Sequence, residues 1–152
     1  MLPTDVVITG LGCTSALGHQ VNQVWQALLR GETGIRAIKQ HDPLTYDPVH
    51  LLAKCEQLDL LSGHKERWPL SAKQRRQMSP VSTMLCHSAL AALEQAELTP
   101  ELITGNARVG AIIGTGVNLC ESDTALDPVQ RNPNWLLQSY PNIHLAHLCM
   151  LI

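Results

Sequence analysis

The first eighteen residues contain the pattern that most restricts the fold of this chain. A β-branched run, residues 5–11, leads into a turn with three glycines and two hydroxyl side chains, and Gly18 closes that turn. The next residues, 20–30, place Val21, Trp25 and Leu28 at helical spacing, with Gly31 suited to the helix end. A short β-branched run closed by glycine is typical of a buried strand. The opening therefore predicts a strand, a tight turn and a helix.

Later segments repeat this alternation. Residues 108–116 form a second continuous apolar run that ends in a glycine turn, which is typical of a strand covered on both faces. Residues 32–77 are broken by glycine and proline and are expected to hold short helices. Further helices are predicted from Ser79-Pro80, from Thr99 to Gly105, and from about Asn142 to the last residue, still running there. Strands separated by helices indicate an α/β fold, a mixed sheet with helical layers.

Composition excludes several classes of protein. A net charge of -2 gives no reason to expect a nucleic-acid partner. No apolar stretch is long enough to span a membrane, and the first residues lack the features of a signal peptide, so a cytoplasmic protein with reduced thiols is expected. The five cysteines are scattered without a C-x-x-C pair, which argues against a zinc or iron–sulfur site.

Two other site types are less favoured by the residues. Gly10 and Gly12 fit the start of a dinucleotide-binding fingerprint, but Ser15 stands where its third glycine belongs, and Glu32 follows a helix rather than a second strand. A turn that needs glycine for its geometry is preferred to a phosphate site. His144 and His147 share a helix face at i, i+3, yet one packed and one exposed histidine is the simpler interpretation. No metal and no cofactor are therefore predicted.

Four motifs in order resemble β-ketoacyl synthases, the condensing enzymes with a thiolase-like fold. Val6 to Gly18 resembles the family's V-V-I-T-G-x-G-x-x-S-x-x-G start, and Trp25 to Ile35 resembles its W-x-x-L-x-x-G-x-S-G-I continuation. Arg76 to Met78 and Arg108 to Gly116 resemble its R-x-M and R-x-G-x-x-x-G-x-G segments. The last match, from Pro141, resembles the P-N-x-x-x-x-x-L helix before the nucleophile. The match is weakest across residues 42–69.

The resemblance implies a decarboxylative condensation of an acyl chain with malonyl on an acyl carrier protein, in fatty acid or polyketide synthesis. The family's cysteine nucleophile and two histidines lie beyond Ile152, so no catalytic residue is assigned here. Residues 1–152 are accordingly expected to be the N-terminal part of the domain, incomplete in its first half and truncated before the nucleophile strand. Cys13 lies near a helix N-terminus, which favours a thiolate, but a small packed thiol is preferred.

Two sites follow from the resemblance. Val117, directly after the glycine turn, corresponds to a residue that lines the acyl-chain pocket, with an ordinary core residue as an equal alternative. Asn118-Leu119-Cys120 replaces the glycines expected next and would reshape that pocket. Lys73, Arg75 and Arg76 correspond to the basic helix that docks the acidic carrier protein, the alternative being a solvated charged turn.

Three functions remain open at this point. The chain is part of an active condensing enzyme, a non-catalytic partner subunit of the chain-length-factor kind, or an inactive truncated product. A homo- or heterodimer with another ketosynthase chain is expected because the family works as a dimer. Asn118 and Leu119 favour the partner subunit, whereas uncovered sheet edges and an uncovered last helix would favour the truncated product.

Overall fold

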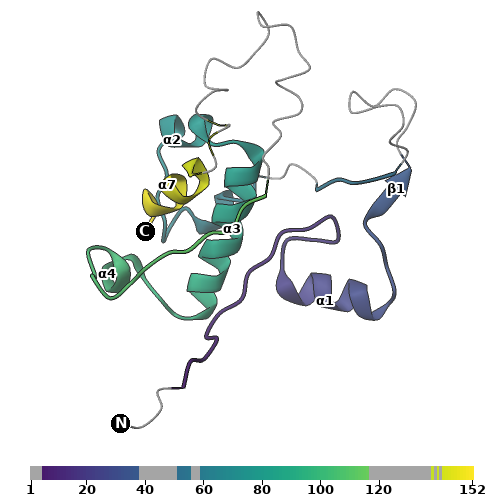
Figure 1. The fold of residues 1–152 in the computed structure, drawn as a ribbon, viewed down its shortest axis with the longest axis horizontal. Helices are drawn as coiled ribbons and strands as arrows, with labels where there is room; N and C mark the ends of the chain where they lie inside the picture. Colours follow the sequence, from purple (N-terminus) through teal and green to yellow (C-terminus); the bar gives the residue numbers. More distant parts are fainter. Residues whose placement is uncertain (1–4, 38–50, 56–58, 117–137, 139, 141) are drawn as a thin grey trace, which may run out of the picture.

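The structure is a computed structural model that describes residues 5–37, 51–55, 59–116, 138, 140 and 142–152. Its central element is helix α3, Pro80–Gln95. Ser79 caps this helix by accepting a hydrogen bond from the Ser82 N–H at 3.1 Å, and Pro80 occupies the first turn, as the sequence predicts. The other described elements are arranged around α3 (Figure 1).

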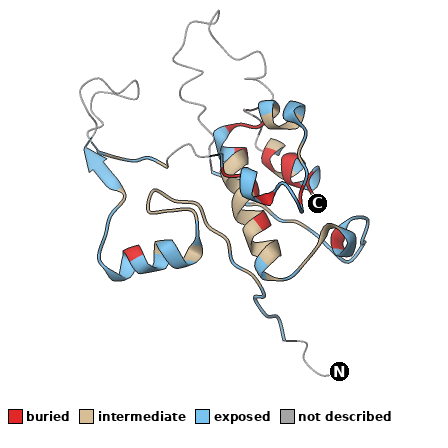
Figure 2. Ribbon diagram, turned by 180° about the vertical axis from the view of Figure 1, so that it is seen from behind, coloured by how far each residue is buried: buried red, intermediate tan, exposed pale blue. Residues whose placement is uncertain are grey.

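A small core lies between α3 and helix α7, Ile143–Cys149. Cys86 and Leu90 of α3 are fully buried, and Trp68 from the segment before α2 packs against them. The remaining buried members of this core are Leu61, Met78, Ile103, Leu148 and Leu151. Figure 2 shows the buried residues concentrated at α3 and α7, whereas the helix nearer the N-terminus is largely exposed.

Short elements surround this core. Between residues 32 and 77 the structure has a 3₁₀ turn η1, Ser62–His64, and helix α2, Ala72–Gln77, so the expectation of short helices in this stretch is confirmed. Helix α4, Pro100–Ile103, starts after Thr99, and Gly105 follows with a φ of +70°. Helix α7 starts where the sequence predicts but ends at Cys149, so the expectation that it continues to the last residue is wrong.

Helix α1, Val21–Leu29, and a small hairpin stand apart from α3 and α7 (Figure 1). The hairpin pairs β1, Ile35–Ala37, with β2, Leu51–Ala53, in antiparallel register, and it is not among the elements that the sequence predicts. Gly31 ends α1 with a φ of +69°, as predicted. The helix buries Ala27 and exposes Trp25, Leu28 and Leu29. Its apolar stripe therefore faces solvent in the described structure.

The two predicted strands, residues 5–11 and 108–116, are not strands in this structure. Val6 is 97% exposed and Ile112 is 100% exposed, the opposite of the expected burial. A strand requires a neighbouring strand to accept and donate its ladder hydrogen bonds. Within the described residues the only sheet is the β1–β2 pair, so neither segment has such a neighbour. No helix in the described part of the chain is long and apolar enough to cross a membrane.

Candidate functional site

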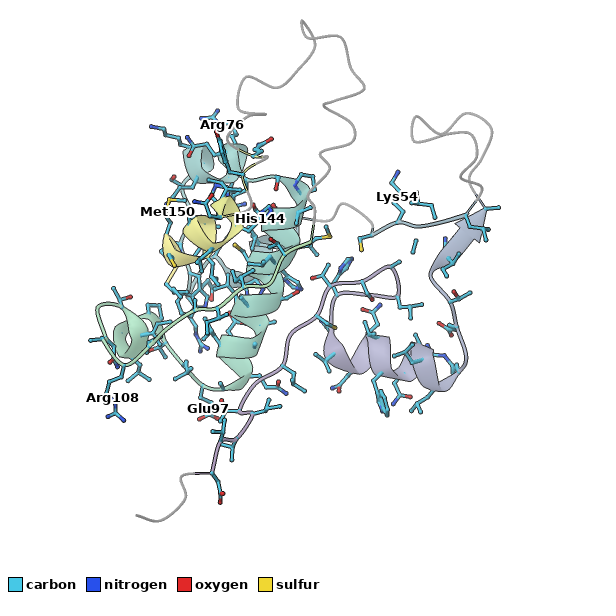
Figure 3. The ribbon with its side chains drawn as sticks, viewed as in Figure 1. Lys54, Arg76, Glu97, Arg108, His144 and Met150 are labelled. Atoms are coloured by element: carbon cyan, nitrogen blue, oxygen red, sulfur yellow. The ribbon has the colours of Figure 1, made fainter. Side chains whose placement is uncertain are left out.

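The predicted basic residues lie together on helix α2. Ser71 and Gln74 fix the start of this helix through a capping box, in which Ser71 Oγ accepts from the Gln74 N–H at 3.2 Å and Gln74 Oε1 accepts from the Ser71 N–H at 2.9 Å. Lys73 and Arg76 are exposed, and Figure 3 shows Arg76 at the outer end of the molecule beside α2. A one-and-a-half-turn helix thus presents two cations to solvent.

Arg75 differs from its neighbours because it is held by an acidic partner. Its guanidinium lies 3.6 Å from the Asp59 carboxylate, and Lys65 approaches the same carboxylate at 3.8 Å. Both distances describe loose ion pairs at the surface, which contribute little stability. The Asp59 carboxylate nevertheless offsets part of the positive charge of Lys65 and Arg75. The sequence grouped Arg75 with Lys73 and Arg76, but the structure separates it from them.

Sequence reasoning missed two further cations, Lys65 and Arg67. Both are exposed and precede α2 in the chain. Arg67 lies close enough to Glu101 to help lower the pKa of that carboxyl, after the larger effects of hydrogen bonds from Thr99 and the backbone. The stretch Lys65-Glu66-Arg67 contains both signs of charge, so only its position next to α2 links it to the basic surface.

Val117 lies outside the described residues, and so does the Asn118-Leu119-Cys120 stretch. The segment just before it, residues 110–113, lines a groove of about 710 Å³ that runs over α3. Gly12 and Thr14 line the opposite side, and Met84 and Ala89 of α3 are among the residues of its floor. The predicted acyl-pocket residue Val117 therefore follows, in the sequence, a segment that lines an apolar groove.

Gly10 and Gly12 allow the N-terminal segment to pack directly against the backbone of α3. A Cβ at Gly12 would lie 1.8 Å from the carbonyl oxygen of Ser88, and one at Gly10 would lie 2.0 Å from that of Ala92. Thr14 Oγ1 then shares a 2.9 Å hydrogen bond with Ser88 Oγ. These positions require glycine because the chain passes close to a helix backbone. This agrees with the prediction that the glycines serve the geometry of the turn and do not form a phosphate site.

His144 and His147 are both buried, so the expectation of one packed and one exposed histidine is wrong. The Nδ1 atoms of His144 and His147 lie 2.8 and 3.0 Å from Ser82 Oγ. Burial lowers the pKa of both imidazoles, and the charge of His144 lowers that of His147 further. Ser82 itself is 0% exposed, so no substrate reaches its hydroxyl. This cluster joins α3 to α7 and is structural.

The described residues include four free cysteines. Burial raises the pKa of the Cys13 thiol, in agreement with a small packed side chain, and raises that of Cys86 to about 12. Cys55 and Cys149 are also free, and Cys120 lies outside the described residues. Among the residues that the structure describes, no group of three or more His, Cys, Asp or Glu side chains is placed to hold a metal ion.

A second polar cluster, which sequence reasoning missed, joins η1 to α3. His64 Nδ1 lies 2.9 Å from Glu94 Oε1, and His64 Nε2 lies 3.0 Å from His87 Nδ1. His87 and Glu94 are seven residues apart, two helical turns, and therefore share a face of α3. That spacing is a signal in the sequence, but nothing in it indicates that His64 comes to the same place.

The sequence of this chain is similar to those of a known protein family. A family model described as "Beta-ketoacyl synthase, N-terminal domain" matches residues 4–147. The 3-oxoacyl-[acyl-carrier-protein] synthase 2 of Coxiella burnetii is 33% identical over 137 residues, 90% of this chain and 30% of that protein. The protein with the same name from Staphylococcus aureus strain COL is 30% identical over 117 residues, 77% of this chain and 26% of that protein.

A solved structure gives the same result for the fold. The crystal structure of a beta-ketoacyl synthase from Burkholderia phymatum STM815 superposes with a TM-score of 0.68 at 21% identity. The superposition covers 95% of this chain and 36% of that one. The chain therefore spans about a third of the length of the proteins it resembles.

Proposed function

This chain belongs to the beta-ketoacyl synthase family and has part of its thiolase-like fold, and from this premise we propose that it is the N-terminal portion of a 3-oxoacyl-acyl-carrier-protein synthase. Such an enzyme transfers an acyl chain from a thioester to a cysteine and condenses it with malonyl on the carrier protein, with loss of carbon dioxide. The family-model match over residues 4–147 carries the proposal. We assign no catalytic residue within the 152 residues.

The exposed apolar segments support this proposal. Residues 5–11 and 108–116 have the composition of buried strands, yet Val6 and Ile112 are almost wholly exposed. Both segments border grooves over α3, the larger one about 710 Å³. Exposed apolar surface of this extent needs a cover in a stable protein. We propose that strands from a longer protein pair with these segments and complete the sheet.

Lys73 and Arg76 are proposed to dock the acyl carrier protein, with Lys65, Arg67 and Arg75 adding to the positive field. An acidic partner would be steered toward this surface, and the effect would fall with added salt. The test is binding of the carrier protein to the native protein and to a Lys73→Glu, Arg76→Glu variant at low and physiological ionic strength. We expect association to slow at least about tenfold at low salt, with little change in dissociation.

The matched control for this experiment is Lys54→Glu, because Lys54 is exposed on the segment after β2, away from α2 (Figure 3). It alters the net charge by the same amount as Lys73→Glu or Arg76→Glu alone, so each of these single α2 variants is compared with it. Equal association rates for the α2 variant and a control of equal net charge would refute docking at α2. Circular dichroism of each variant establishes that the exposed substitutions leave the fold intact.

Val117 is proposed to line the acyl-chain pocket. It follows the segment 110–113 that lines the groove over α3, and the bulky residues after it would shorten the space for the acyl chain. Val117→Gly is then expected to shift the products of condensation toward longer chains. An unchanged product distribution, with unchanged stability, would leave Val117 without a role in chain length.

Two other functions are distinguished by one experiment. A chain-length-factor-like subunit keeps the fold but lacks the nucleophile, and a truncated product lacks it because translation stops. The downstream coding sequence, the intact mass of the native protein and condensation of labelled malonyl-carrier protein separate them. Condensation by a longer native protein supports the enzyme. A mass that ends at Ile152, or a longer protein without activity alone, refutes it for this chain.

The assembly and compartment are part of the same proposal. We propose a homo- or heterodimer with another ketosynthase chain in the cytoplasm, acting in fatty acid or polyketide synthesis without nucleic acid, membrane, metal or cofactor. Sedimentation of the native protein tests the dimer. Analysis of the acyl products tests the pathway, because reduced saturated chains and poly-keto chains differ in mass.

A further inference from the structure

Helix α2 carries the proposed docking cations but buries none of its own residues. It is six residues long, and its capping box joins Ser71 to Gln74 at its own N-terminal end. A helix this short has little stability of its own in water. The place of α2 on the molecule therefore depends on contacts between its end and the rest of the chain.

The C-terminal end of α2 makes such contacts. Met78, which follows the helix, is buried in the core. The last carbonyl groups of a helix have no partner within it. The carbonyl oxygen of Arg75 accepts a hydrogen bond from the Met78 N–H at 3.2 Å, and that of Gln77 accepts one from the side-chain Nε2 of Gln138 at 3.1 Å. Gln138 thus satisfies a carbonyl group that α2 itself leaves without a donor.

The hydrogen bond from Gln138 joins two distant parts of the chain in a place that excludes water. Gln138 is 6% exposed, and it lies 61 positions after Gln77 in the sequence. Removing the donor of such a bond leaves a carbonyl group facing protein instead of water, which is unfavourable. The ion pair of Arg75 with Asp59, by contrast, is loose at 3.6 Å and lies at the surface, where it contributes little. Of these two contacts, the bond from Gln138 therefore does more to hold α2.

We propose that Gln138 is a positioning residue for docking of the carrier protein. Its side-chain amide fixes the C-terminal end of α2 and so sets where Lys73 and Arg76 stand on the surface. Because Gln138 is buried, it acts through α2 and not by contact with the carrier protein. This inference rests on the proposed docking of the carrier protein at α2, and it adds the residue that holds the docking helix in place.

The position of α2 affects docking because the cations act as a pair. Lys73 and Arg76 are three residues apart, so they lie on the same side of the helix and present one positive surface to an acidic partner. An element that buries no side chain opens at low cost in free energy. Without the bond from Gln138, α2 leaves its place in a larger fraction of molecules. The apparent affinity for the carrier protein falls with the fraction that keeps α2 in place.

The test replaces Gln138 in the native protein with methionine, which is similar in length and has no hydrogen-bond donor. Hydrogen exchange of the amides of residues 75–78 measures how firmly α2 is held, and stopped-flow mixing with the acyl carrier protein at low salt measures docking. For Gln138→Met we expect the opening constant of these amides to rise about fivefold, the effect of one part-buried hydrogen bond. Association should slow about two- to threefold. The matched control Gln26→Met, at an exposed position of α1, should change neither quantity.

A double-mutant cycle separates positioning from a general loss of stability. In the Lys73→Glu, Arg76→Glu background, Gln138→Met should slow association no further, because the cations that it positions are gone. Equal slowing in both backgrounds, or unchanged exchange of amides 75–78, would overturn the role of Gln138 while leaving docking at α2 intact. Failure of docking itself gives a different result: association is then insensitive to Lys73→Glu, Arg76→Glu in the otherwise native protein, which refutes the docking surface and this inference with it.

Discussion

Gly12→Ala is the substitution for which the structure predicts the most specific effect. A Cβ at this position would lie 1.8 Å from the Ser88 carbonyl oxygen, and that atom belongs to the backbone of α3 and cannot rotate away. Real Cβ atoms essentially never come within 3.0 Å of such an atom, so the N-terminal segment must retreat by more than 1 Å. That retreat also breaks the 2.9 Å hydrogen bond between Thr14 Oγ1 and Ser88 Oγ.

The expected loss of stability combines three effects. Overpacking of a close contact costs about 1–3 kcal/mol, and a lost part-buried hydrogen bond costs about 1 kcal/mol. Alanine restricts the unfolded chain and returns about 0.4–1 kcal/mol. The net destabilisation is therefore about 1–3.5 kcal/mol, which lowers the Tm of a chain of this length by about 2–14 °C.

Urea unfolding followed by tryptophan fluorescence and far-ultraviolet circular dichroism measures this loss. Gly110→Ala is the matched control, because Gly110 lines the opposite side of the groove and a Cβ there meets nothing within 4 Å. The control should stay within about 0.5 kcal/mol of the wild type. If Gly12→Ala unfolds at the same urea concentration as Gly110→Ala, the N-terminal segment does not rest on α3.

Three further predictions concern the packed core. Burial lowers the pKa of His144 and His147, so below about pH 6.5 the unfolded chain binds more protons than the folded one. The contribution of these histidines to the free energy of unfolding should be constant above that pH and fall below it, by up to about 1.4 kcal/mol per pH unit for each histidine. A flat profile of stability from pH 7 to 5 would contradict their burial. Cys86, with a pKa of about 12, should resist alkylation at pH 8 until denaturant is added, whereas the exposed Cys149 should react in the native protein, as peptide mass analysis can verify. Leu90→Ala should cost about 2–5 kcal/mol in urea unfolding, since Leu90 is fully buried, and a cost below 1 kcal/mol would show that this face of α3 is loosely packed.

Local signals in the sequence were sufficient for the helices. Ser79-Pro80 predicts the start of α3, because the effects of a hydroxyl N-cap and of a proline at the first helical position are confined to the first turn. Gly31 and Gly105 mark helix ends through positive φ values, which are also local. Pairing of strands is not local. Residues 5–11 have strand composition, but the ladder partner that would make them a strand lies elsewhere in space, so composition predicted burial that the described structure does not show.

The same distinction holds for the candidate site. The motif around Arg76 identified α2 as the basic element, and Lys73 and Arg76 are exposed there. Nothing in the motif indicated that Asp59 would pair with Arg75, because the two are separated by sixteen positions and an irregular stretch. Residues 117–137 lie outside the described part of the chain, so Val117 remains a prediction.

Helix α3 shows why a simple amphipathic pattern is a poor guide here. One face carries Ser88 and Ala92 against the glycines of the N-terminal segment. A second face carries Ser82, which bonds the histidines of α7, and a third carries His87 and Glu94, which meet His64. The polar residues of this helix therefore point to protein partners and not to solvent, as in a helix surrounded by structure. A central helix is recognisable by small and hydrogen-bonding residues on several faces, and a substitution on each of these faces should be destabilising.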